Sequence, residues 1–121
     1  MRQLAVAPAM KPRRVSLLVS EATGTEGFWV WAKQFKTPGG ARSELANELK
    51  VLKATVPGYE PFAVPGIPGA FGYAAEGPGL NVAFASGHYY YLVGEFVSAV
   101  SASSEATITA AAKRLYRGVH G

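Results

Sequence analysis

The sequence predicts an α+β fold: an antiparallel sheet of about five strands with two helices packed against it, both to one side of the sheet. Three observations support this prediction. Residues 80–97 have the pattern of two apolar strands joined by a two-residue turn, and two other segments have helical periodicity. Strands come in runs between the helices, in the order ββα–loop–β(β)βα, which is typical of hairpins and not of a doubly wound sheet.

The first predicted elements are a hairpin and a helix. Residues 15–22 and 28–36 are rich in β-branched and aromatic side chains and flank a turn-like segment. Thr37 is the predicted N-cap of a helix that has Pro38 in its first position and runs to about Ala54. Its predicted apolar stripe is Ala41, Leu45, Leu49 and Leu52, and its solvent side is Arg42, Glu48, Lys50 and Lys53.

The middle of the chain is predicted to be an irregular connection. Residues 57–69 contain four prolines and three glycines, which exclude a central strand and a helix interior. Tyr59, Phe62 and Ile67 are expected to attach this connection to the core. A short strand over residues 70–75 and a turn over 76–79 follow it.

The last predicted elements are a second hairpin and a closing helix. If Ser86-Gly87 is the turn, the period of two places six apolar side chains on one face. They are Leu80, Val82, Phe84, Tyr89, Tyr91 and Val93. The helix begins near Ser101 or Ser103 and turns Ile108, Ala112, Leu115 and Val119 toward the sheet. Residues 14–121 then form one domain, complete or part of a longer protein, behind a disordered arm over residues 1–13.

Composition excludes several classes of function. The chain has no cysteine, which removes disulfides, thiolate zinc sites and cysteine nucleophiles, and no aspartate, which removes a Ser–His–Asp triad. Its two histidines and scattered glutamates lack the spacing of metal ligands, and no glycine-rich phosphate loop is present. The sequence therefore predicts no cofactor, no metal and no enzymatic activity.

Charge and hydropathy limit the partners and the compartment. The net charge is +4, but the basic clusters are short and lack interleaved aromatic residues, which disfavours nucleic-acid binding. No apolar run is long enough to span a membrane. The first residues lack the pattern of a signal peptide, which predicts a cytoplasmic protein as written; a leader upstream of the true start would instead predict an envelope or secreted protein.

Four residues are candidates for ligand binding: Trp31, Asn81, His88 and Tyr90. His88, Tyr90 and Asn81 are expected to share one face of the hairpin and to line the mouth of a polar pocket, while tryptophans such as Trp31 stack on ligands when exposed. The plainer interpretation is a histidine at a turn edge with an amphipathic tyrosine beside it, and tryptophans that pack in the core. Glu95, on the opposite face, is a candidate general acid if it is buried, although a basic partner is the commoner reason for such a carboxylate.

The best-supported function is a non-enzymatic binding or accessory domain that presents an apolar surface or pocket to a small ligand or a protein partner. A concave pocket near Trp31, Tyr90 and His88 would favour this function. The main alternative is a purely structural or oligomerising domain, whose two-sided apolar strands are covered by a second copy in a homodimer. The third is an enzyme that uses Glu95 or His88, which requires two titratable groups in one cleft.

Several short motifs are shared with a known kind of protein. They are the turn Ile67-Pro68-Gly69-Ala70, the hairpin over residues 81–94, the alanine-rich helix over 110–116 and the segment FKTPGGARSELANEL. In these motifs the chain resembles poorly characterised actinobacterial-type cell-envelope proteins and lipoproteins, chiefly over residues 65–120. The resemblance implies a similar fold and an exported sensor-like or ligand-binding role, with no catalytic residue to carry over. The chain departs from this pattern in lacking a leader and a lipobox cysteine.

Overall fold

The computed structural model describes residues 28–76, 79–96 and 101–120. The strands in these ranges are β1 (Trp29–Gln34), β2 (Glu60–Phe62), β3 (Phe71–Ala75), β4 (Gly79–Ser86) and β5 (Tyr89–Phe96). The helices are α2 (Pro38–Thr55) and α3 (Ala102–His120). The predicted arm over residues 1–13 and the predicted strand over residues 15–22 lie outside the described residues.

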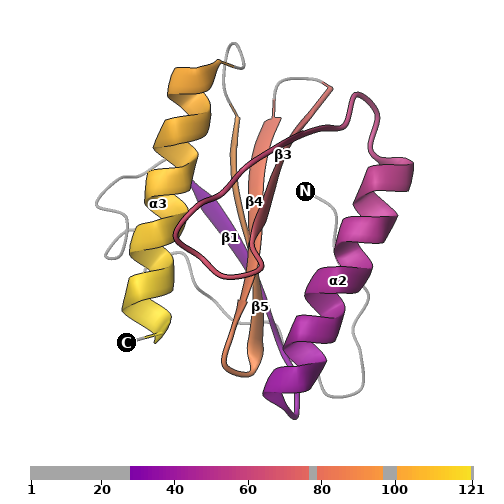
Figure 1. Cartoon of the computed structure of the whole chain (residues 1–121), viewed down its shortest axis with the longest axis vertical. Coiled ribbons are helices and arrows are strands. Elements are labelled where there is room, and N and C mark those ends of the chain that lie inside the picture. The colour runs from indigo at the N-terminus through magenta and orange to yellow at the C-terminus, as the bar shows by residue number, and fades with distance from the viewer. Residues whose placement is uncertain (1–27, 77–78, 97–100, 121) are drawn as a thin grey trace.

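The five strands form one antiparallel sheet in the order β1-β5-β4-β3-β2. The prediction of an α+β fold with a five-stranded antiparallel sheet and two helices is therefore confirmed (Figure 1). The long hairpin β4–β5 lies at the centre, as its apolar sequence suggested. The fifth strand of the observed sheet is β2, a short edge strand that the sequence analysis did not anticipate.

The two helices cover opposite faces of the sheet, so the expectation of helices to one side is wrong (Figure 1). On one face α3 packs through Ile108 and Leu115 against Phe84 and its neighbours. On the other face α2 packs through Leu45 against Tyr90 and residues around it. The reason is that β4 and β5 are apolar at both odd and even positions, and each face has to be buried. The result is a helix–sheet–helix arrangement in three layers.

The β4–β5 turn consists of Gly87 and His88, one residue later than predicted. Gly87 has φ of +56°, and no described non-glycine residue has positive φ, which defines a type II′ turn with glycine in its first central position. The predicted assignment of side chains to the two faces is nevertheless correct. Moving the turn by one residue changes each cross-strand partner by two positions, and a shift of two keeps every side chain on its face. Phe84 pairs with Tyr91 and Val82 with Val93, all on the face that α3 covers.

The connection over residues 57–70 is held by the three side chains that were expected to hold it. The ring of Tyr59 stacks on Tyr73 with centroids 5.3 Å apart, and Ile67 is only 3% exposed. Phe62 lies over Gly72, its partner on β3, where any side chain would overlap the ring. β2 forms within this connection despite Pro61, because an edge strand leaves the missing N–H on the side that needs no partner.

Both helices begin at the residues that the sequence analysis proposed as caps. The Thr37 hydroxyl accepts a hydrogen bond from the N–H of Gly40 at 3.0 Å. The N–H of Ser104 donates to the Ser101 hydroxyl at 3.2 Å, and the N–H of Ser101 donates to the Ser104 hydroxyl at 2.8 Å. This reciprocal pair is a capping box in which serine replaces the usual glutamate.

Candidate functional site

A groove of about 470 Å³ opens at the edge of the sheet, beside the end of β4. It exists because the strands differ in length: β3 begins at Phe71, opposite Ala83, whereas β4 continues to Ser86. No described strand therefore lies beside the last residues of β4 on that side. The groove occupies the place that an extension of β3 would fill.

One wall of the groove is a face of α2. Its residues are Arg42, Leu45, Ala46 and Leu49. Their spacing of three, one and three residues puts them on one side of the helix. Leu45 is buried, Leu49 is half-buried, and Arg42 and Ala46 are exposed. The helix therefore offers an apolar strip to the groove, with one cation near its N-terminal end.

The chain before β3 explains why the groove is not filled by a longer strand. The register places residue 69 opposite Ala85, two positions beyond the pair of Phe71 with Ala83. Gly69, however, has φ of +74°, a left-handed conformation that ends an extended strand. The chain turns there toward α2, so that a Cβ on Gly69 would lie 3.7 Å from the Leu45 side chain. Pro68 and Gly69 consequently form a rim of the groove.

The backbone of Ala85 faces the groove. In a two-residue hairpin the closing pair, here Ser86 and Tyr89, exchanges both of its hydrogen bonds, and this pattern alternates along the strand. The N–H and C=O of Ala85 therefore point away from β5, toward the side on which β3 has already ended. Among the described residues, no backbone partner is seen for this main-chain donor and acceptor at the groove.

The far wall belongs to the other helix. Tyr116 of α3 lines the groove and packs edge-on against Phe84, with ring centroids 5.6 Å apart. Since α2 and α3 lie on opposite faces, the groove wraps around the open edge of the sheet between them. Segments from α2, the connection before β3, the start of β3, the end of the hairpin and α3 all contribute to it.

The groove is chemically simple. Most of its lining is apolar, no histidine or acidic side chain takes part, and its charged residue is Arg42. Within the described part of the chain Arg42 has no ion-pair partner. A lining of this kind is suited to contact with an apolar molecule.

The four predicted ligand-binding residues lie elsewhere, and none of them lines this groove. Asn81 and Tyr90 share one face of the hairpin, as expected, and Trp31 lies on the same face of the sheet, which α2 covers. Tyr90 is fully buried, and Trp31 and Asn81 are half-buried. Asn81 lies five residues, or about 17 Å of strand, before the end of β4 at Ser86, so it is not at one mouth with His88. Ligand binding by these four residues stays a prediction.

His88 has a structural contact that the sequence did not suggest. It is exposed in the turn, its ring Nδ1 lies 3.1 Å from the carbonyl oxygen of Phe35, and its own carbonyl accepts a hydrogen bond from the Phe35 N–H at 2.7 Å. Phe35 directly follows β1. His88 therefore ties the β4–β5 turn to the end of β1.

Charged side chains are buried between α2 and the sheet. Lys33 of β1 is 4% exposed and forms an ion pair with Glu44 of α2. Glu48 is 3% exposed, so its predicted place on the solvent side of the helix is wrong. The buried residues of α2 are Ala41, Leu45, Glu48 and Leu52, while Leu49 turns toward the groove. The sequence contained one sign of this burial. Lys33 shares a strand face with Trp29 and Trp31, which indicates a cation on a face that is covered.

Glu95 lies on the other face, which α3 covers. It pairs with Leu80, and its Oε1 is buried without a hydrogen-bond partner among the described residues, although the side chain as a whole is half-exposed. Burial raises the pKa of this carboxyl above its usual value. His88 lies in the turn before β5 and Glu95 near the far end of that strand, seven residues or about 23 Å away, so these two titratable groups do not share a cleft.

In residues 28–76, 79–96 and 101–120 no three His, Cys, Asp or Glu side chains are grouped in a way that would hold a metal ion. Neither α2 nor α3 is long and apolar enough to cross a membrane.

Comparisons of the chain with protein-family models, with curated proteins and with solved structures find no match. The resemblance to actinobacterial-type envelope lipoproteins therefore stays a prediction from the sequence motifs alone.

Proposed function

We propose that this domain binds a small apolar ligand in the groove between α2 and the open edge of β4. The observation that carries the proposal is the groove itself: about 470 Å³, largely apolar, and lined by residues from five separate segments. Ligand sites of folded proteins are typically concave, apolar and roughly 300–1,000 Å³ in volume.

The surroundings of the groove support a site that is formed before the ligand arrives. Tyr116 is held by its edge contact with Phe84, a core residue that is fully buried. Leu45 lies between Tyr90 and the turn at Gly69, and the type II′ turn fixes the end of β4. A ligand that enters such a groove does not have to order these side chains, which favours binding.

The proposal is tested by blocking the groove with a tryptophan. Ala46 is exposed on α2 and lines the groove, whereas Ala54 is exposed on the same helix outside it. We expect Ala46→Trp to weaken binding of 1-decanol, a neutral apolar probe, at least tenfold in isothermal titration calorimetry. Ala54→Trp is the matched control and should bind like the wild type, with circular dichroism showing that both variants fold.

Two outcomes would contradict the proposal. Wild-type protein that does not bind 1-decanol has no apolar ligand site of this kind. Equal binding by the wild type and Ala46→Trp would place the probe somewhere other than the groove.

A further inference from the structure

The groove has two distinct ends. α2 starts directly after β1, and the end of β1 is bonded to the hairpin turn through Phe35 and His88, so the first turns of α2 lie at the turn end of the sheet (Figure 1). Arg42 lies at that end, together with Gly87. Leu49 is seven residues further along the helix, about 10 Å away.

The end of the groove away from the turn is apolar and closed. Phe71 begins β3 and occupies the position beside β4, so a molecule lying along the open edge cannot continue past it in the plane of the sheet. Leu49 and Pro68 complete this end. From Ala83, opposite Phe71, to Gly87 the groove extends about 13 Å along β4. A short apolar chain fits this space, with its tip at Phe71.

The end of the groove near the turn is polar and positively charged. Arg42 is exposed there and has no ion-pair partner among the described residues, while the nearby Glu44 is already paired with Lys33. The N–H of Ala85 points to the same groove. A guanidinium and a main-chain N–H that points to the groove both favour an acceptor of negative charge, above all a carboxylate.

We propose that the groove takes a medium-chain amphiphile with a carboxylate head, the head beside Arg42 and the apolar tail extending to Leu49 and Phe71. This inference rests on the proposed function and names its ligand class. The positive charge at one end of the groove favours an anionic head, and the closed apolar wall at the other end favours a single apolar tail. An extended peptide is disfavoured as the ligand, because a strand added to the edge of β4 would have to pass the position that Phe71 occupies.

The test is a titration of the full chain with carboxylates from hexanoate to dodecanoate and with the primary alcohols of equal length, at low ionic strength. Each buried methylene is worth about 0.8 kcal/mol, so affinity should rise about fourfold per carbon until the tail reaches the closed end, and then stop rising. Each carboxylate should bind at least fivefold more tightly than its alcohol. That preference should disappear in Arg42→Gln.

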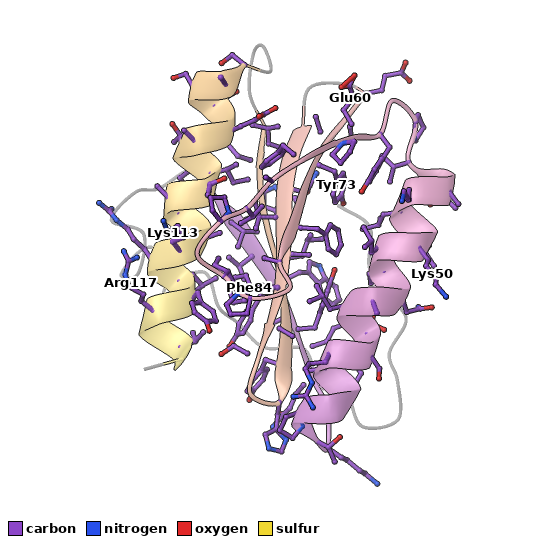
Figure 2. The ribbon with its side chains drawn as sticks, viewed as in Figure 1. Lys50, Glu60, Tyr73, Phe84, Lys113 and Arg117 are labelled. Atoms are coloured by element: carbon purple, nitrogen blue, oxygen red, sulfur yellow. The ribbon has the colours of Figure 1, made fainter. Side chains whose placement is uncertain are left out.

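Lys50→Gln is the matched control, because it removes one positive charge from the same helix. Lys50 is exposed, does not line the groove and points away from the sheet (Figure 2). It should keep the full preference for the carboxylate. An equal loss in both variants would mean general attraction to a positive protein and would overturn the inference.

The remaining outcomes separate the ligand class from the proposed function. If alcohols bind as well as carboxylates, the groove binds apolar ligands but the inference of a carboxylate head fails. If neither series binds, the proposed function fails as well. If affinity keeps rising through dodecanoate, the claim that the groove is closed at Phe71 is wrong. If the peptide acetyl-Leu-Val-amide binds more tightly than decanoate, strand addition at Ala85 is favoured instead.

Discussion

The two faces of the sheet are both covered by a helix, but they are built differently. On the α3 face the contact is made by fully buried apolar side chains, namely Leu80, Val82, Phe84, Val93, Ile108 and Leu115. On the α2 face the buried residues include Lys33 and Glu48, two tryptophans are only half-buried, and the groove opens at the margin. One face therefore contributes chiefly stability, and the other combines packing with polar groups and access.

The difference starts in the sequences of the helices. The buried stripe of α3 is Ile108, Ala111, Ala112 and Leu115, in which two alanines allow close approach to the sheet. The buried stripe of α2 contains a carboxylate, Glu48, and its apolar Leu49 faces the groove. Buried polar groups are tolerated only when they have partners. The stability of the α2 face therefore depends on specific polar pairs, whereas the stability of the α3 face depends on buried apolar area.

The largest expected effect is the loss of a core side chain from the α3 face. Phe84→Ala should lower the free energy of unfolding by about 3–5 kcal/mol, because the fully buried ring contacts Tyr91 and Tyr116 and would leave a cavity. Leu45→Ala on the α2 face should cost about 2–3 kcal/mol, since the adjacent groove allows the site to relax. Urea unfolding measures both, and equal losses would remove the distinction between the faces.

A second variant tests the buried ion pair of the α2 face. Lys33→Met should destabilise the fold by about 3 kcal/mol, because it leaves Glu44, whose side chain is only 14% exposed, without its cation. The double variant Lys33→Met with Glu44→Leu should recover most of that loss, since two apolar side chains can replace a buried pair. A double variant as unstable as the single one would contradict the assigned pairing.

The smallest expected effect concerns Glu95, the polar exception on the α3 face. Its folded-state pKa is raised above the usual value, so folding favours the protonated form, and stability falls as the pH rises from about 4.5 through the raised pKa. Glu95→Gln cannot titrate and should lack this part of the pH dependence, with a gain over the wild type at pH 7 that shrinks at pH 4. Urea midpoints at both pH values measure it, and a constant difference between the two proteins would contradict the raised pKa.

Much of the fold could be predicted because its signals are local. The alternation along β4 and β5 defines the faces even with the turn placed one residue early, since a shift of two partners preserves them. Thr37 and Ser101 mark the helix starts by side-chain chemistry that operates within one turn. These features depend on residues that are close in the sequence, so they can be predicted without knowledge of the tertiary packing.

The arrangement around the site could not be predicted in the same way. Whether Glu48 is buried depends on which side of α2 meets the sheet, and that is decided by packing against strands that are distant in the sequence. The groove depends on the start of β3 at Phe71, opposite Ala83, while β4 continues to Ser86. It also depends on residues from α2 and α3 that meet at this place. No short window of sequence contains that information, so the predicted residues shared the right face but not the groove.

The most direct test of this account is a map of amide chemical shifts in the full chain during titration with decanoate. We expect saturable shifts at Ala85, Gly87, Leu49 and Phe71, which surround the groove, and none beyond error at Leu80 and Ile108, which are fully buried between α3 and the sheet. Shifts centred on the α3 face, or spread evenly over both faces, would contradict the division between a face that stabilises the fold and an open edge that binds.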